Sequence, residues 1–393
     1  MPSTEPVRFS LVARMWGVEQ YLPEFLSSLT AQRPGRYTAE VLFVDDGSPD
    51  ASGRLAQQWL DGPGGQAGFT GQVIDQANAG PSAAANAGLD AAGGDWISWP
   101  DPDDRLDPGY LAAVADFLAE RAGSEPAIVD TKLVNLVEAT GQVEDNYVYR
   151  FKYQRGRRVV ALAAEPTTVT GRTNNVFFPL ALVRELGVRF DPLVRASEDE
   201  LFVASFLLRA GAAASARVGL VPDAVYIYRR RASGDSLAAR APSQPDFLTA
   251  HVGQVALPLA RLGASLNGGR APRWLANLLI GTEKWTFERE LNPATRVDWA
   301  RVEERRYVRG LRQIVALLEA EHIAGFDMFD YPAAGKEFLL GLRDRRLRVG
   351  DAAAAMFGAG LRRLTPWWRR AWRRLPKSIR TRAARLRAGG GAP

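Results

Sequence analysis

The chain has 393 residues, 46% hydrophobic and 24% charged, a composition that excludes a disordered or fibrous protein. It has no cysteine and only two histidines. Disulfides, thiolate zinc sites and cysteine nucleophiles are therefore excluded, and a metal site built from several histidines is disfavoured.

The net charge of +6 is concentrated at one end of the chain. No acid follows Asp351, whereas eleven bases lie between Arg362 and Arg387, and removing these leaves 39 bases against 44 acids. An acidic body with a basic tail argues against a nucleic-acid binder. Because we find no apolar run of membrane-spanning length and no signal-peptide pattern, we expect a cytoplasmic protein.

From residue 7 onward, short apolar runs alternate with helical patterns, which predicts an α/β sheet built from βαβ units. The first half of the chain contains five expected strands: Phe9–Ala13, Glu40–Asp45, Gly71–Asp75, Trp96–Trp99 and Ala127–Val137. The expected helices there are Tyr21–Thr30, Ser52–Leu60, Ser82–Ala92 and Pro108–Arg121. The segment Asp61–Gly71 has five glycines and a proline, so we expect a loop.

Further along, Tyr147–Tyr153, Val159–Leu162 and Ala224–Tyr228 suggest strands, and Ser197–Ala210 a helix. The remainder is helical in pattern: His251–Leu262, Arg273–Leu291, Trp299–His322, Ala333–Arg343 and Asp351–Leu361. We expect Trp274, Trp285 and Trp299 to lie in a core, with a platform for the acceptor as the alternative. The predicted domains are a catalytic unit (1–245), a helical domain (246–360) and a basic tail (361–393).

Two polar segments follow the second and third expected strands, where open α/β sheets bind ligands. Asp45 and Asp46 precede Gly47 and can accept hydrogen bonds from a base or a ribose, although a simple turn is an equally open interpretation. The second segment, 78–89, places small residues at a helix start, which suits a diphosphate. A capped, alanine-rich helix explains it equally well.

Two acidic segments come later in the chain. Asp101, Asp103 and Asp104 stand within four residues and repel one another, so they suit a divalent cation that carries phosphates. The alternative is a solvated acidic turn. Glu198 and Asp199 open a helix, where a carboxylate can serve as a general base or simply complement the helix dipole.

Together, the segments Val-Asp-Asp-Gly-Ser, Asn-x-Gly, Asp-x-Asp-Asp and Glu-Asp, in this order, resemble family 2 glycosyltransferases of the GT-A fold. The resemblance spans about residues 7 to 240. It implies a Rossmann-like nucleotide-binding sheet with helices on both faces, followed here by a helical C-terminal region. Within the family, Trp96–Asp104 and Tyr226–Ser236 look most like the modules of teichoic acid and other cell-wall polyol-phosphate enzymes.

The resemblance implies a role for each matching residue. Asp199 is the base of an inverting transfer, with Glu198 beside it, and Asp103 with Asp101 holds Mn²⁺ or Mg²⁺ on the donor diphosphate. The remaining implied contacts to a nucleotide-sugar, most simply a UDP-sugar, are Ala13, Trp16, Asp45, Asp46, Asn78, Gly80, Asn86, Asp101, Arg229, Arg231 and Ser236. The implied acceptor is a hydroxyl of a cell-wall or surface glycan or of a polyol-phosphate.

The chain departs from the family pattern at two places. Residues 14–17 read Arg-Met-Trp-Gly where members commonly have Pro-x-Tyr-Asn, and Ala85 stands where an arginine is usual. A non-catalytic scaffold with a GT-A-like fold and a nucleotidyltransferase therefore remain as alternative hypotheses.

The tail combines tryptophan and arginine on opposite helical faces. Leu361, Leu364, Trp368, Trp372, Leu375 and Ile379 recur at spacings of three and four residues. This pattern is typical of an interfacial helix attracted to anionic lipid. We therefore expect a peripheral position on the inner face of the cell membrane and no nucleic acid, with a polyanionic acceptor or a solvated tail as alternatives.

Overall fold

A computed structural model describes residues 5–121, 123–194, 197–211, 216–234, 245–291 and 299–357. The tail, residues 361–393, and the predicted site residue Ser236 lie outside these segments. Among the helices in the described segments, none is both long and apolar enough to cross a membrane.

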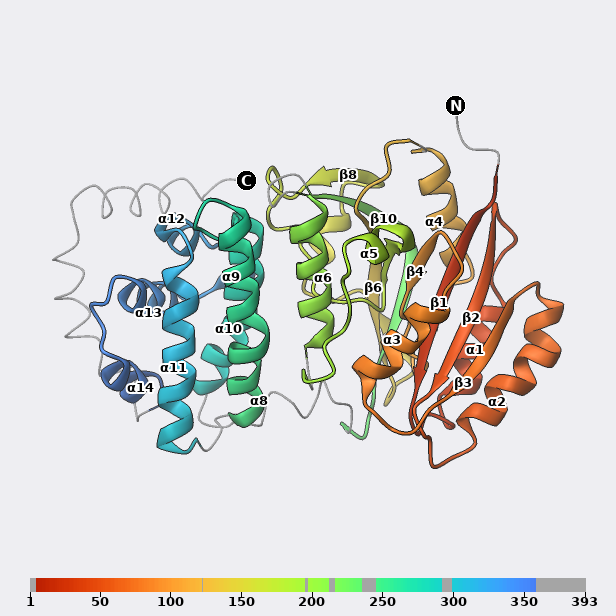
Figure 1. Ribbon diagram of the computed structural model, residues 1–393, viewed down its shortest axis with the longest axis horizontal. Coiled ribbons are helices and arrows are strands. Elements are labelled where there is room, and N and C mark those ends of the chain that lie inside the picture. Colours follow the sequence, from red (N-terminus) through yellow and green to blue (C-terminus); the bar gives the residue numbers. More distant parts are fainter. Residues whose placement is uncertain are drawn as a thin grey trace.

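The N-terminal part of the molecule is built on one mixed sheet of ten strands (Figure 1). The main path through the sheet is β3-β2-β1-β4-β9-β6-β10-β5, while β7 pairs with β6 and β8 with β10. The strands are β1 (Val7–Met15), β2 (Tyr37–Asp45), β3 (Thr70–Asp75), β4 (Trp96–Ser98), β5 (Arg105–Leu106), β6 (Ile128–Val137), β7 (Gln142–Glu144), β8 (Arg158–Ala161), β9 (Val176–Pro179) and β10 (Arg217–Arg230).

Strands β1 to β4 are parallel, so their carboxyl ends meet at one edge of the sheet. Strand β9 runs antiparallel to both β4 and β6, and β10 runs parallel to β6. The first four expected strands and Ala127–Val137 are confirmed within one to three residues at each end. Except for the exposed edge strand β3, they contain continuous apolar runs, which are typical of strands buried on both faces.

Helices cover both faces of this sheet, and α6 lies between the sheet and the C-terminal helices (Figure 1). The N-terminal helices are α1 (Leu22–Thr30), α2 (Ser52–Trp59), α3 (Pro81–Ala91), α4 (Tyr110–Ala119), α5 (Leu180–Glu185) and α6 (Glu198–Ala210), with single helical turns η1 (Leu60–Gly64) and η2 (Arg150–Tyr153). Helix α3 packs closely on β1 because Gly88 has no side chain; a Cβ there would stand 2.1 Å from Cγ1 of Val12.

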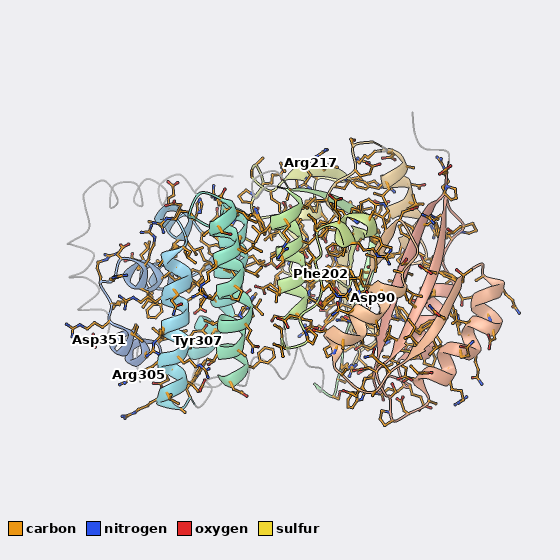
Figure 2. All side chains as sticks on the ribbon, in the orientation of Figure 1. Asp90, Phe202, Arg217, Arg305, Tyr307 and Asp351 are labelled. Carbon is orange, nitrogen blue, oxygen red and sulfur yellow. The ribbon has the colours of Figure 1, made fainter. Side chains whose placement is uncertain are left out.

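The C-terminal region is helical throughout its described part. Its elements are α8 (Pro245–Ala250), η4 (His251–Ala256), α9 (Leu257–Leu266), α10 (Arg273–Leu291), α11 (Arg301–Ala316), α12 (Ala320–Ala324), η5 (Met328–Asp330), α13 (Ala333–Arg343) and α14 (Val349–Phe357). One hydrophobic core continues from the sheet through α6 into these helices. Near its centre Phe202, labelled in Figure 2, stacks on Phe190 with ring centroids 4.3 Å apart.

Four expected elements differ from the structure in informative ways. Tyr147–Tyr153 is not a strand: Lys152 and Tyr153 turn inward to the buried carboxylate of Asp130, and this forces a helical turn. The expected loop 61–71 includes the helical turn η1.

The predicted helix Trp299–His322 is two helices, α11 and α12, because tertiary donors occupy the carbonyls that would continue the first. Ala271 N donates to Leu317 O at 2.9 Å, and Arg343 Nε donates to Leu318 O at 2.9 Å. Strand β10 is longer than expected, since a bulge between Val221 and Val225 lets it continue past Pro222.

The three tryptophans of the C-terminal region divide into two groups. Trp274 and Trp299 are buried in the core, as predicted. The prediction for Trp285 is wrong: its side chain on α10 is 47% exposed. An exposed tryptophan on a helix that packs against the rest of the molecule marks that side of α10 as a candidate ligand surface.

Candidate active site

The loops that follow β1, β2 and β3 are joined around Asp46. Its Oδ1 accepts hydrogen bonds from Gln76 Nε2 (2.6 Å) and Ala79 N (2.8 Å), and its Oδ2 accepts one from Gly80 N (2.9 Å). Gly80 adopts φ +88°, which suits glycine and starts α3. Asp46 and Gly80, both predicted to contact the nucleotide-sugar, therefore lie together. Asp46 also fixes the shape of the loop that includes Asn78.

Trp16 is exposed at the same edge of the sheet. Its side chain is 59% exposed, and the following Gly17 N donates to Ser48 Oγ at 3.2 Å. Asp45 accepts a hydrogen bond from Ser48 N at 2.8 Å. This arrangement leaves the Trp16 ring available to stack on a planar ligand beside Asp45.

Two other residues predicted to contact the nucleotide-sugar are buried. Ala13 is fully buried in β1. Asn86 is buried on α3, where its Nδ2 donates to Phe190 O (2.8 Å) and its Oδ1 accepts from Phe190 N (3.0 Å). Since both ends of this amide are occupied, Asn86 anchors the segment before α6 and is not placed to contact a donor.

Arg14, at the end of β1, lies at the centre of an acidic cluster from two distant parts of the chain. Its Nη2 donates to Asp101 Oδ1 at 3.1 Å, and its Nη1 lies 3.5 Å from Glu198 Oε1 and 3.7 Å from Asp199 Oδ1. The Arg14 side chain is 11% exposed. One guanidinium thus links the predicted metal-binding segment to the predicted base.

Burial is the main cause of the raised pKa values in this cluster. It raises the pKa of Glu198 to about 7, with a further contribution from the neighbouring charge of Asp199 and an opposing one from Arg14. Burial also raises the pKa of Asp199, while the Arg14 guanidinium opposes that rise. A carboxyl with a raised pKa is a stronger proton acceptor, so Asp199 has the property that a general base needs.

The rest of the predicted metal segment is held from β10. Asp103 Oδ2 accepts hydrogen bonds from Arg231 Nε (2.9 Å) and Nη2 (2.7 Å), and Asp104 accepts from Tyr226 Oη (2.7 Å) and Arg229 N (2.7 Å). Burial and the neighbouring acids raise the pKa of both carboxyls. The repulsion expected from the sequence is therefore real, and β10 supplies much of its compensation.

Arg229, predicted to contact the donor, is committed to internal partners. Its Nη2 bonds to Glu24 (2.8 Å), its Nη1 lies 3.3 Å from Glu138, and its Nε donates to Asp103 O (2.7 Å). The side chain is buried. It positions the segment that includes Asp103, and the structure does not place it to bind a ligand.

The carboxylates suit a divalent cation that takes most of its ligands from elsewhere. In the described segments, no group of three or more acidic or histidine side chains forms a ready-made metal site. Mg²⁺ commonly uses one or two carboxylates and completes its shell with phosphate and water. Asp103, with a pKa raised by burial and by Asp101 despite Arg231, is the side chain best suited to hold such a cation.

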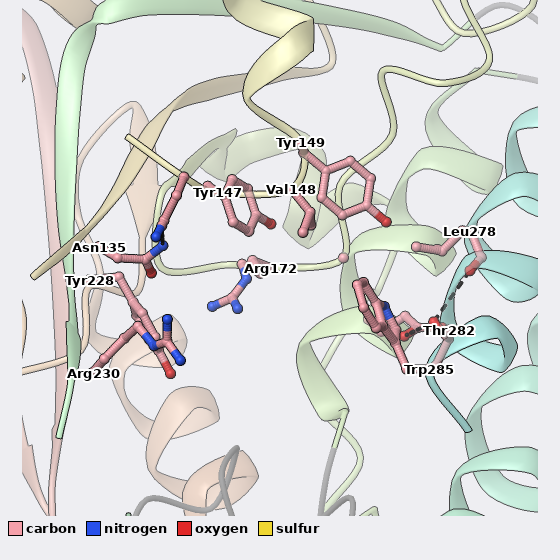
Figure 3. Close-up of a pocket in the computed structure, with 13 residues that line it drawn as sticks. Asn135, Tyr147, Val148, Tyr149, Arg172, Tyr228, Arg230, Leu278, Thr282 and Trp285 are labelled. Atoms are coloured by element: carbon pink, nitrogen blue, oxygen red, sulfur yellow. Dashed lines mark hydrogen bonds between the residues drawn. The ribbon is translucent and has the colours of Figure 1, made fainter. Parts of the chain in front are cut away.

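The sequence interpretation missed the residues that line a cavity of about 500 Å³ beside α6 (Figure 3). They come from β6, the 146–149 turn, the 171–172 segment, α6, β10 and α10: Asn135, Asn146, Tyr147, Val148, Tyr149, Gly171, Arg172, Glu200, Tyr228, Arg230, Leu278, Thr282 and Trp285. Glu200 is the residue after Asp199. The polar run Thr170–Asn175 between two apolar stretches was the one available sequence signal.

The comparisons with known proteins agree with this geometry. Residues 10–162 match the model of Glycosyl transferase family 2. The chain is similar to the minor teichoic acid biosynthesis protein GgaA of Bacillus subtilis, with 26% identity over 235 residues, 59% of this chain and 49% of that protein.

It is also 22% identical over 246 residues to the poly(ribitol-phosphate) beta-N-acetylglucosaminyltransferase TarS of Staphylococcus aureus, covering 61% of this chain and 39% of TarS. The chain thus spans half or less of these relatives. A solved structure of S. aureus TarS 1–349 superposes with a TM-score of 0.63 at 16% identity, covering 91% of both chains. The expected GT-A-like sheet with a helical C-terminal region is confirmed.

Proposed function

We propose that this protein is an inverting glycosyltransferase that moves a sugar from a nucleotide-sugar to a hydroxyl of a cell-wall or surface polysaccharide or polyol-phosphate. The observation that carries the proposal is the Arg14 cluster. It joins Asp101, at the donor edge of the sheet, to Asp199, whose pKa is raised toward the pH at which a base works.

The donor would bind along the carboxyl ends of β1 to β4. The nucleotide would contact Trp16 and the loop around Asn78, which Asp46 holds in place by hydrogen bonds. The N-terminus of α3 at Gly80 suits an anionic group of the donor. A UDP-sugar is the first donor to test, because a solved TarS structure similar in fold contains UDP-GlcNAc.

The chemical step requires one proton acceptor and one leaving-group site. Asp199 would take the proton of the acceptor hydroxyl, the oxygen would attack the anomeric carbon, and the nucleoside diphosphate would leave in a single displacement that inverts the configuration. Asp103, with Asp101 beside it, would hold Mn²⁺ or Mg²⁺, which stabilises the departing diphosphate by its charge. Arg231 contacts Asp103 and would position that carboxylate.

The test compares the wild type with Asp199→Asn, using a panel of UDP-, GDP- and CDP-sugars with Mn²⁺. We expect slow donor hydrolysis by the wild type and a loss of at least about a hundredfold in the variant, with unchanged nucleotide binding. Near-normal transfer by the variant would remove Asp199 from the mechanism. If the wild type neither binds nor hydrolyses any of these donors, the result would favour the non-catalytic scaffold.

The tail would bring the enzyme to an anionic membrane surface. Its residues 361–393 lie outside the described segments, so this part of the proposal depends on their tryptophan and arginine pattern. Co-sedimentation with anionic vesicles tests it, using the whole chain and a form that ends at Gly360. Equal pelleting of the two would reject the anchor.

A further inference from the structure

The cavity beside α6 contains two arginines that form no ion pair with an acid in the described part of the chain. Arg172 and Arg230 both line it (Figure 3). In the part of the chain that the structure describes, neither guanidinium forms an ion pair with a carboxylate. The neighbouring arginines differ: Arg14, Arg229 and Arg231 are each paired with at least one acid.

Arg172 is held in place by aromatic rings. Its Cζ lies 4.9 Å from the ring centroid of Tyr228 and 5.6 Å from that of Tyr147. Figure 3 shows the guanidinium in the middle of the cavity, between these tyrosines and Trp285. Ring faces attract a cation and hold it without neutralising its charge, so Arg172 is oriented and still fully charged.

Glu200 is the one carboxylate among the lining residues; its Oε2 has partners, whereas its buried Oε1 has no hydrogen-bond partner in the described part of the chain. Glu200 Oε2 lies 3.4 Å from His251 Nε2 and accepts a hydrogen bond from Thr282 Oγ1 at 3.3 Å. The pKa of His251 is raised: burial lowers it, but the charge of Glu200 raises it by more. Among the lining residues, the two arginines outnumber the one carboxylate, so the cavity has a net positive charge.

Part of the remaining wall is aromatic. Tyr149 packs edge-on against Phe329 with centroids 4.9 Å apart, and Trp285 lies 6.0 Å from the same ring. Flat aromatic surfaces bury the C–H faces of sugars and polyols, while the hydroxyl groups of the ligand remain free to accept and donate hydrogen bonds. A volume of about 500 Å³ suits a ligand of one or two such units.

We propose that this cavity is the acceptor subsite for a phosphodiester-linked polyol or sugar, whose phosphate binds Arg172 and Arg230 and whose carbon chain packs on Tyr149 and Trp285. The inference rests on the proposed function and narrows its acceptor to an anionic polymer. Glu200 connects the two sites, because it lines the cavity and directly follows the proposed base.

This position has a direct chemical purpose. Arg172 lies near enough to Asp199 for their charges to interact, so a phosphate bound at Arg172 would hold the hydroxyls of the same unit close to the proposed base. Holding an acceptor in that geometry lowers the entropic cost of the attack. Arg172 would then be a specificity-determining residue that selects acceptors bearing a negative charge.

The experiment measures binding of a synthetic ribitol-phosphate tetramer to the whole chain by calorimetry at two salt concentrations. Arg172→Gln should weaken binding by about tenfold to a hundredfold, the usual loss for a charge-assisted hydrogen bond. Trp285→Ala should weaken it at both salt concentrations. The matched control, Arg189→Gln, removes an exposed arginine paired with Asp90 and should bind like the wild type.

Nucleotide binding is measured in the same samples and separates the two proposals. If UDP binds normally but Arg172→Gln and Trp285→Ala bind the tetramer like the wild type, the acceptor subsite is overturned and the transferase proposal stands. If no nucleotide binds but both variants lose the tetramer, the subsite stands and the transferase proposal fails. Equal binding of an uncharged chitotetraose, or tighter binding of an RNA oligomer, would also overturn the inference.

Discussion

Replacing Arg14 by glutamine removes the one cation shared by Asp101, Glu198 and Asp199. At an effective dielectric constant of about 20, the 3.1 Å contact with Asp101 corresponds to roughly 5 kcal/mol of attraction. The cost of burying the arginine offsets part of this attraction. Because breaking a buried pair leaves uncompensated charge, we expect the free energy of unfolding at pH 7.5 to fall by about 3 kcal/mol.

The loss should depend on pH in a defined direction. Without the guanidinium, the pKa values of Glu198 and Asp199 rise further, so the folded state favours their protonated forms more strongly. The variant should therefore lose more stability at pH 8 than at pH 5, where protons can replace the missing cation.

The assay is urea unfolding of wild type, Arg14→Gln and the control Arg189→Gln at pH 5 and pH 8. The control breaks an exposed pair, with side chains 49% and 63% exposed, and should lose less than about 1 kcal/mol at either pH. A loss for Arg14→Gln that is equal at both pH values would refute the reasoning. So would a loss no larger than that of the control.

Three more predictions follow from single contacts. Glu198→Gln should stabilise the protein relative to wild type at pH 8 but not at pH 5. The reason is that the stability linked to the raised pKa of Glu198 is fully present below pH 4.5 and is lost as the pH rises past about 7. Thermal melts that show no difference between variant and wild type at both pH values would contradict this. Lys152→Met leaves Asp130 buried without its cation and should lower the free energy of unfolding by about 3–5 kcal/mol, whereas adding Asp130→Leu should restore most of it in the same urea titration. Trp16→Ala should weaken UDP binding by about tenfold in calorimetry without shifting the melting temperature of the free protein, since the ring is exposed, and equal affinities would exclude stacking.

The sequence predicted well where the strands β1 to β4 end and which polar residues follow them, because these signals are local. Strand β1 is a continuous buried run, and Asp45 and Asp46 follow directly on β2, so the strand and the position of its ligand-facing end are visible together. The same holds for the first turn of α6. In each case, the element that carries the side chain also fixes where it lies.

The interior of the site could not be predicted in this way. Arg14 stood out only as a departure from the family pattern, because its partners lie 87 and 184 residues further along the chain. Asn86 matched the family motif, yet tertiary packing directs its amide to Phe190. The cavity around Arg172 combines six segments, and only one of them, the polar run Thr170–Asn175, offers a signal in the sequence.

Strand β10 serves both proposed substrates through the alternation of its side chains. Tyr228 and Arg230 line the proposed acceptor cavity, whereas Arg229, and Arg231 just past the end of the strand, contact the segment that includes Asp103. Pairing with β6 fixes this alternation, with Arg230 opposite Val137. Deleting one residue from the end of this strand would turn the side chains that face the cavity toward the Asp103 segment, and the reverse. An insertion or deletion here would therefore change acceptor choice and donor positioning together, whereas a substitution can change one of them alone.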